Sequence, residues 1–286
     1  MFEVRALPSK NVSDEKINNG TDIILPFQIE PYSLRGRFIG LSEATTSIIK
    51  KHKYPDPVAN LLAEMLVLAP CLSSALKYDG VFTLQVSGNG PVKTLLADIT
   101  NDGELRGYAN FDAQQLASLN LRSNAQPSLN QLTGTGYIAF TVDQGSKSER
   151  YQGIVELSNS NLVDCTHAYF RNSEQLETVI NLAVEQSAQG TWKGVAIMIQ
   201  RLGFAGGQGI SQGITEDEYD ESWRNAAIML GSCKRSELLN NERTPEKLLF
   251  QLFHETGVRI YPKKSITAKC RCSVEKVERV LQSLEN

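Results

Sequence analysis

Residues 81–99, VFTLQVSGNGPVKTLLADI, contain two runs of alternating apolar and polar residues on either side of Asn89-Gly90. A period of two is typical of strands that bury one face, and both Asn89 and Gly90 tolerate the positive φ of a tight turn. The stretch therefore predicts a β-hairpin. Residues 137–142 and 151–157 show the same alternation and predict a second hairpin.

The residues before this hairpin predict a strand and a helix. Residues 24–41, ILPFQIEPYSLRGRFIGL, alternate in a way that suits a strand with one buried face. In residues 42–53, SEATTSIIKKHK, the apolar side chains fall on one helical face behind Ser42, which is a suitable N-cap.

The most apolar stretch, residues 58–76, approaches the length of about 20 residues that a membrane span needs. It contains Asn60, Glu64 and Pro70, however, and polar or charged side chains are costly inside a bilayer. We therefore expect a buried helix and no membrane association. Because proline lacks an amide proton, Pro70 is expected to kink this helix or split it in two.

A change of composition divides the chain. A helix at 162–170 and strands at 178–184 and 195–202 complete a first part that we expect to be an α+β domain with mostly antiparallel sheet. The glycine-rich residues 203–213, GFAGGQGISQG, then predict a domain boundary.

The chain beyond this boundary is predicted to be helical. Residues 244–257, TPEKLLFQLFHETG, begin with Thr244 as a cap and end at Gly257. Residues 273–284 predict a last helix. An apolar stripe at helical spacing comprises Tyr219, Trp223, Leu230, Leu248, Leu249, Leu252 and Phe253. Such a stripe is usually core, and the alternative is a helical layer that can detach and expose an apolar surface.

Composition narrows the class of protein. The 286 residues are 41% hydrophobic and 21% charged, with a net charge of -3, which indicates a globular chain without the basic excess of a nucleic-acid-binding protein. Residues 1–20 contain no apolar run, so they predict a mobile tail and no secretory signal. Five cysteines without such a signal suggest the reducing cytoplasm.

Cys270 and Cys272 are separated by one residue. In an extended segment their side chains project to the same side and can share a metal ion. Lys269 and Arg271 are cationic and favour the thiolate, which makes both thiols oxidisable. The spacing alone is equally compatible with two incidental exposed thiols. Core positions are favoured for Cys71 and Cys165, and no histidine pair, nucleophile elbow or phosphate-binding loop is present.

Several of these stretches together resemble the bacterial redox-regulated 33-kilodalton heat-shock chaperone family. The resemblance extends from about Pro31 to Leu284 and rests on these sequences in this order: LRGRFIGL, HKYPDPVANLLAEMLVLAPCLSSALKYDG, QVSGNGPVKTLLAD, RGYANF, ERYQGIVEL, YFRNSEQL, LLFQLFHETGVRIY and CRCSVEKVERVLQSL. Two departures, Glu177 in place of proline and Pro70 within the apolar helix, do not affect the fold expected.

The resemblance implies a mobile tail at 1–24, an α+β core domain at 25–204, a helical linker at 205–264 and the first half of a zinc module at 265–286. In the family, a C-x-C and a later C-x-x-C hold one zinc ion, and oxidation forms two disulfides, releases zinc and unfolds the module and linker. Cys270 and Cys272 match the C-x-C as metal ligands and redox-active thiols, and no C-x-x-C is present. We therefore expect a truncated chain that binds zinc weakly or not at all.

The function expected from the resemblance is that of an ATP-independent holdase, a non-enzymatic chaperone that binds unfolded client proteins through the linker stripe under oxidative stress. It implies no nucleic-acid or membrane partner and a homodimer as a possible active form. Two alternatives stay open at this point: a thiol oxidoreductase that uses the C-x-C pair, and a structural or interaction protein whose linker never detaches.

Overall fold

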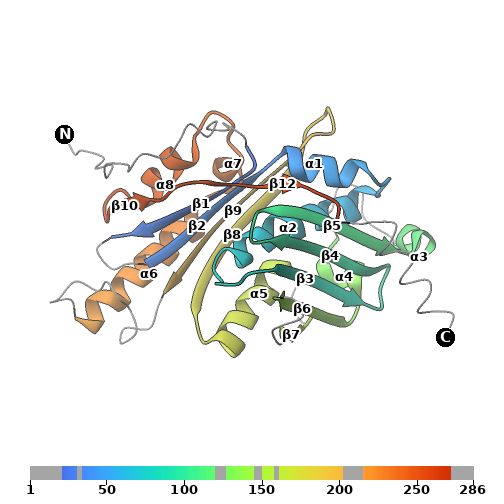
Figure 1. Ribbon diagram of the computed structural model, residues 1–286, viewed down its shortest axis with the longest axis horizontal. Coiled ribbons are helices and arrows are strands. Elements are labelled where there is room, and N and C mark those ends of the chain that lie inside the picture. Colours follow the sequence, from blue (N-terminus) through green and yellow to red (C-terminus); the bar gives the residue numbers. More distant parts are fainter. Residues whose placement is uncertain are drawn as a thin grey trace.

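A computed structural model describes residues 21–30, 34–119, 127–144, 150–157, 161–201 and 215–271. Two six-stranded sheets pack on α2 (Asp56–Ser73), which contacts strands of both (Figure 1). All strand pairs among these residues are antiparallel except one, so the expected α+β fold with mostly antiparallel sheet is confirmed.

The first sheet has the strand order β10-β1-β2-β9-β8, with β11 also paired to β1. Its strands are β1 (Ile23–Ile29), β2 (Leu34–Leu41), β8 (Glu177–Gln186), β9 (Trp192–Arg201), β10 (Val258–Ile260) and β11 (Lys264–Ser265). The single strand predicted for residues 24–41 is wrong, because this stretch forms the antiparallel pair β1 and β2. Glu30 and Pro31 interrupt the apolar alternation, and proline cannot donate a ladder hydrogen bond.

The second sheet has the strand order β12-β5-β4-β3-β6-β7. Its strands are β3 (Val81–Gly88), β4 (Val92–Thr100), β5 (Glu104–Phe111), β6 (Gly136–Asp143), β7 (Tyr151–Glu156) and β12 (Thr267–Ala268). Both predicted hairpins are confirmed, as β3 pairs with β4 and β6 pairs with β7.

The turn between β3 and β4 differs from the prediction. Neither Asn89 nor Gly90 has a positive φ. Instead, their N–H groups donate to the carbonyls of Thr135 and Thr133, at 3.1 and 2.8 Å. A Cβ on Gly90 would lie 2.5 Å from the backbone nitrogen of Gly134, so glycine is required here by a close approach of two backbones.

The first helix, α1 (Glu43–Lys50), is capped from outside its own sequence. The predicted cap, Ser42, makes no side-chain capping hydrogen bond. The Asp22 carboxylate accepts hydrogen bonds from the N–H groups of Ser42 and Ala44 instead, at 2.5 and 2.9 Å. A carboxylate satisfies these free N–H groups and also favours the positive end of the helix.

Pro70 does not split α2, which continues to Ser73. The proline lies in the last turn, so its missing N–H removes only one hydrogen bond of the helix, and its carbonyl accepts from Ser74 N at 3.0 Å. Among the described residues α2 is the one helix long and apolar enough to cross a membrane, and 78% of it is buried inside the molecule. It is a core helix, as predicted.

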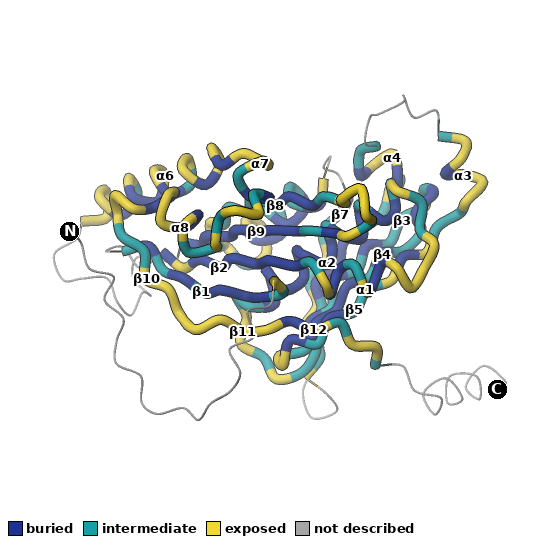
Figure 2. Tube along the Cα trace, turned by 90° about the horizontal axis from the view of Figure 1, so that it is seen from above, coloured by how far each residue is buried: buried dark blue, intermediate teal, exposed yellow. Residues whose placement is uncertain are grey.

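The remaining helices surround the sheets. The short helices are α3 (Ala113–Ser118), α4 (Leu129–Thr133), α5 (Leu162–Tyr169) and the π-helical turn η1 (Phe170–Glu174). Of these, α4 contacts β4 of the second sheet, η1 contacts β8 of the first, and α5 contacts β7 and β8. The helix predicted at 162–170 is thus confirmed. The linker helices α6 (Glu216–Ser232), α7 (Arg235–Leu238) and α8 (Pro245–Phe253) cover the face of the first sheet opposite α2 (Figure 2).

The predicted domain division is only partly visible. The boundary near residue 204 falls in residues 202–214, and residues 1–20 of the tail expected at 1–24, the last helix at 273–284 and Cys272 also lie outside the described residues. Ile23 and Ile24, which were expected in that tail, belong to β1. Residues 205–264 were expected to be a helical linker, but after α8 they include β10 and β11, which join the first sheet. The division into domains stays a prediction.

Candidate functional site

The first sheet presents an apolar face to the linker helices. Alternate residues of β1 point to this face, while Ile24 between them belongs to the core around α2. The face is formed chiefly by Leu25, Phe27, Ile29, Leu34, Phe38, Ile197 and Ile199. These side chains are at most 5% exposed, so the linker keeps almost all of this surface from water.

All seven residues of the predicted linker stripe pack on this face. Tyr219, Trp223 and Leu230 contribute from α6, and the other four contribute from α8, each at most 9% exposed. The Phe253 ring stacks on Phe27 with centroids 6.0 Å apart. Leu238 and Leu239 complete the cluster and were missed by the sequence reasoning, although two adjacent leucines were a usable signal.

Polar contacts hold the ends of the linker helices. Asn181 of β8 donates through Nδ2 to the carbonyls of Leu230 and Cys233, at 3.0 and 2.7 Å. These carbonyls belong to the C-terminal end of α6, where a helix has unpaired acceptors. Lys193 of β9 donates to the Leu239 carbonyl at 2.8 Å.

The other end of α6 is held by Arg201. Its guanidinium lies 4.6 Å from the Tyr219 ring centroid and forms ion pairs with Asp220 and Glu177. The linker therefore lies on the sheet through an apolar centre with charged and hydrogen-bonded ends.

Residues 258–271, called the strap here, connect the linker to Cys270 across both sheets (Figure 1). β10 and β11 pair with β1 of the first sheet, and β12 pairs in parallel with β5 of the second. Lys263 also forms an ion pair with Glu246 of α8 at 2.7 Å. The position of the strap is thus coupled to that of the linker.

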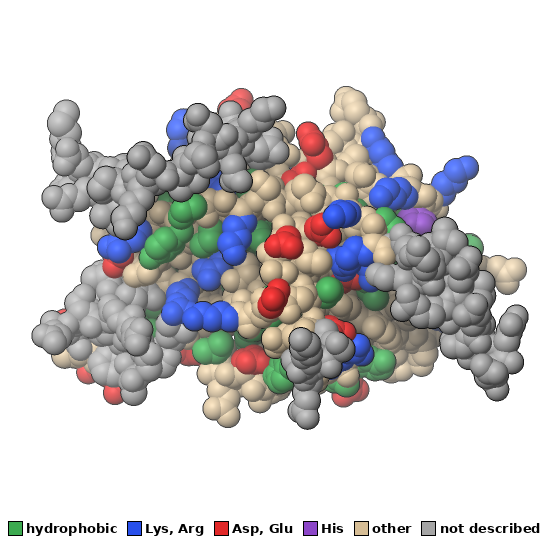
Figure 3. All heavy atoms as spheres, in the orientation of Figure 1, with side chains coloured by type: hydrophobic (Ala, Val, Ile, Leu, Met, Phe, Trp, Pro, Cys, Tyr) green, Lys and Arg blue, Asp and Glu red, His purple; other side chains and the backbone are tan. Residues whose placement is uncertain are grey.

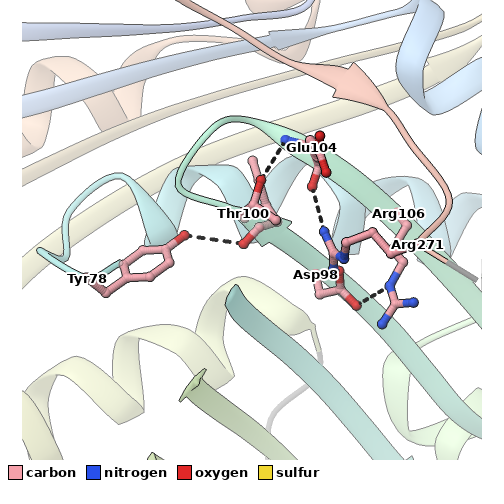
Figure 4. Close-up of polar contacts among 7 residues, drawn as sticks. Tyr78, Asp98, Thr100, Glu104, Arg106 and Arg271 are labelled. Atoms are coloured by element: carbon pink, nitrogen blue, oxygen red, sulfur yellow. Dashed lines mark hydrogen bonds and ion pairs between the residues drawn. The ribbon is translucent and has the colours of Figure 1, made fainter. Parts of the chain in front are cut away.

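The strap ends on a buried carboxylate (Figure 4). The Asp98 side chain on β4 is 1% exposed and forms ion pairs with Arg106 of β5, at 2.5 Å, and with Arg271 of the strap. Lys269 forms an ion pair with the Glu104 side chain. The backbone carbonyl of Glu104 accepts a hydrogen bond from Arg271 Nη1 at 3.2 Å. Both neighbours of Cys270 are therefore anchored to the second sheet.

The described cysteines differ in accessibility. Cys270 is exposed, whereas Cys71, Cys165 and Cys233 are buried. Burial raises the pKa of Cys71 to about 12 and that of Cys233 to about 11, so both stay as thiols. Only Cys270 among these four is placed to react with a dissolved oxidant.

The residues that the structure describes do not form a complete zinc site. No group of three or more cysteine, histidine or acidic side chains among them is arranged to hold a metal ion. Cys270 and Cys272 supply two thiolates at most, whereas a structural zinc site takes four ligands.

Comparisons with known proteins agree on one family. Residues 22–286 match the family model described as Hsp33 protein. The chain is 36% identical to the 33 kDa chaperonin of Caulobacter vibrioides over 265 residues, which are 92% of this chain and 85% of the relative. It is 32% identical to the 33 kDa chaperonin of Pseudomonas fluorescens, covering 92% and 81% of the two chains.

The fold is similar to that of a solved structure. The crystal structure of the 33 kDa chaperonin from Thermotoga maritima superposes with a TM-score of 0.75 at 20% identity, covering 93% of this chain and 88% of the other.

Proposed function

The chain belongs to the Hsp33 family, and we propose that it is an ATP-independent holdase, a cytoplasmic chaperone that binds unfolding proteins. The observation that supports this proposal is the apolar face of the first sheet, which, among the described residues, is covered by the linker helices. Detachment of these helices would expose two apolar surfaces at once, the face itself and the linker stripe. Large exposed apolar patches bind other proteins.

The linker is in equilibrium between a docked and a detached state in this proposal. The buried side chains favour docking, since burial stabilises by about 25 cal/mol per Å² of apolar surface. An unfolding client offers comparable apolar surface. Client binding therefore replaces the apolar burial, and the free energy it contributes, that is lost when the linker detaches. No nucleotide hydrolysis is needed for such an exchange.

We infer that redox control is weak in these 286 residues. The thiol pair at Cys270 and Cys272 has no C-x-x-C to complete a four-thiolate zinc site. The strap and its ion pairs, rather than a metal, then set how firmly the linker is held. Oxidation of Cys270 acts on a residue directly beside the Arg271 anchor, so we expect it to modulate docking and not to switch it.

The test is suppression of the aggregation of a thermally unfolding client at near-stoichiometric ratio.

Asn181→Ala removes two hydrogen bonds that hold α6, each worth about 1 kcal/mol. We therefore expect the variant to suppress aggregation at a several-fold lower concentration than the parent chain. Asn101→Ala, in the exposed turn after β4, serves as the matched control.

Hydrogen exchange over residues 216–256 separates the holdase from a static interaction module. Detachment predicts faster exchange in α6 to α8 than in β1, β2 and β9, and a further increase in Asn181→Ala. Uniformly slow exchange in the linker, together with no suppression of aggregation under oxidising or reducing conditions, would refute the proposal.

A further inference from the structure

A second surface feature lies away from the linker, between the α1–α2 connection and β5. It is a pocket of about 410 Å³ lined by Lys51, His52, Lys53, Tyr54, Tyr108, Ala109, Asn110 and Phe111. The hollow is shallow and open to solvent, so it suits a ligand that lies against the protein surface. The pocket thus combines four rings with two cationic side chains, and Lys50 at the end of α1 adds a third nearby in the sequence.

The rings form a connected platform. The Tyr54 hydroxyl accepts a hydrogen bond from Ala109 N at 3.1 Å, which fixes this ring against β5. The His52 ring lies 5.1 Å from Tyr54 and 5.9 Å from Tyr108, and Phe111 lies 6.2 Å from Tyr54. Tyr108 is 48% exposed, so part of its surface remains open to a planar ligand.

The lysines of this pocket are not neutralised by the surrounding protein. The side chains of Lys50, Lys51 and Lys53 form no ion pair or hydrogen bond with any residue that the structure describes. The carboxylate beside Phe111, that of Asp112, is occupied by capping α3 through the N–H groups of Gln114 and Gln115. Figure 3 shows lysine and arginine side chains gathered around a histidine on one side of the molecule.

We propose that this pocket binds a free nucleotide, with the base against Tyr108 and His52 and the phosphates on Lys51 and Lys53. Bases stack on aromatic side chains regardless of their identity, and lysine binds phosphate as a point charge. Of the β5 residues, only Glu104 and Leu105 pair with β12, so β12 does not cover the part of β5 that lines the pocket, where Ala109 N donates to Tyr54.

The whole molecule favours a small ligand over a nucleic-acid strand. The net charge of the chain is -3, which repels a long polyanion but leaves room for a local cluster of lysines to hold two or three phosphate charges. The sequence contains no phosphate-loop motif. The proposal is therefore limited to nucleotide binding, which is compatible with an ATP-independent chaperone.

The test is calorimetric titration of the full chain with ADP, adenosine, inorganic pyrophosphate and a short oligoadenylate. We expect saturable one-to-one binding of ADP, with adenosine and pyrophosphate each at least tenfold weaker because each lacks one half of the recognised chemistry. Tyr108→Ala and Lys51→Glu should each weaken ADP binding at least tenfold, while Tyr108→Phe keeps the ring and should retain it.

Matched controls lie outside the pocket. Tyr137→Ala removes a tyrosine of similar exposure, 42%, from β6 of the same sheet, and Lys77→Glu changes an exposed lysine beyond the other end of α2. Neither should alter ADP binding. The proposal is overturned if ADP does not saturate at millimolar concentration, if the controls weaken binding as much as the pocket variants, or if oligoadenylate binds far more tightly than ADP.

Discussion

Glu64 shows how a single buried group can make stability depend on pH. Its carboxylate on α2 accepts a hydrogen bond from Asn60 Nδ2 at 3.2 Å. Burial raises its pKa to about 7, against the opposing attraction of Arg235 in α7. A largely desolvated carboxyl group on α2 thus has a pKa near neutral pH and interacts with Arg235 of the linker.

The sign of this effect follows from proton binding. Because the pKa of Glu64 is raised in the folded state, the folded chain holds the proton more tightly than the unfolded chain does. Its contribution to stability is fully present below pH 4.5 and is lost as the pH rises through about 7. Above that pH, folding must bury a charged carboxylate.

We expect Glu64→Gln to raise the free energy of unfolding by about 2 kcal/mol at pH 8 and to change it little near pH 4.5. Urea unfolding of both chains at the two pH values measures the difference. Glu255→Gln, at an exposed position after α8, should have no such pH dependence. Equal effects of Glu64→Gln at both pH values would contradict the assignment.

The strap is the element that ties the linker to the second sheet. It pairs with β1 and β5, contacts α8 through Lys263 and Glu246, and ends on Asp98 through Arg271. A short parallel pair such as β12 and β5 has few hydrogen bonds of its own. The ion pair with the buried Asp98 carboxylate therefore contributes a larger share of the stability of this strap than it would for a longer strand.

Asp98→Asn tests this role of the strap. The substitution removes the charge that Arg106 and Arg271 share, and we expect it to lower the free energy of unfolding by about 2 kcal/mol, less than for a fully buried pair because Arg106 is partly exposed. Hydrogen exchange over residues 264–271 should accelerate at least tenfold, and exchange in α8 should rise with it.

The control for this experiment is Asp102→Asn, in the exposed turn between β4 and β5. Unchanged exchange in the strap of Asp98→Asn would show that Arg271 is not an anchor. Faster exchange in the strap with no change in α8 would show that the strap and the linker are not coupled.

At the scale of the whole molecule, the described residues form two sheets on the buried helix α2, with the linker docked on the outer face of the first sheet. In the part of the chain that the structure describes, this outer layer covers the apolar face and belongs to a cluster separate from the core around α2. Its release is therefore compatible with an intact core, which is what a holdase requires.

We expect this 286-residue chain to suppress client aggregation to within about twofold with or without peroxide, since two thiolates cannot form a closed zinc site. Zinc measured after dialysis should be well below one ion per chain, and Cys270→Ser should remove what remains. Cys71→Ser changes a buried thiol and serves as the control for zinc content. A stoichiometric zinc ion or a many-fold activation by peroxide would contradict this prediction.

Patterns that depend on neighbouring residues were predictable from the sequence alone. The hairpin at 81–99, the apolar stripe from Tyr219 to Phe253 and the Thr244 cap, whose hydroxyl accepts from Lys247 N at 3.3 Å, rest on spacing within one segment. Periodicity determines which side chains share a face. These features therefore indicated the linker and its apolar surface, while client binding by that surface stays a prediction.

Only the tertiary structure decided the contacts between distant segments. Asp22 caps α1 in place of Ser42, Gly90 meets the backbone of Gly134, and Asp98 pairs with Arg271. No local pattern specifies such pairs, because each depends on how two sheets and a strap are placed in space. The sequence thus determined the helices at 42–53, 58–76, 162–170 and 244–257, the two hairpins and the apolar stripe of the linker. The tertiary structure decided which sheet face the stripe covers and what holds the linker in place.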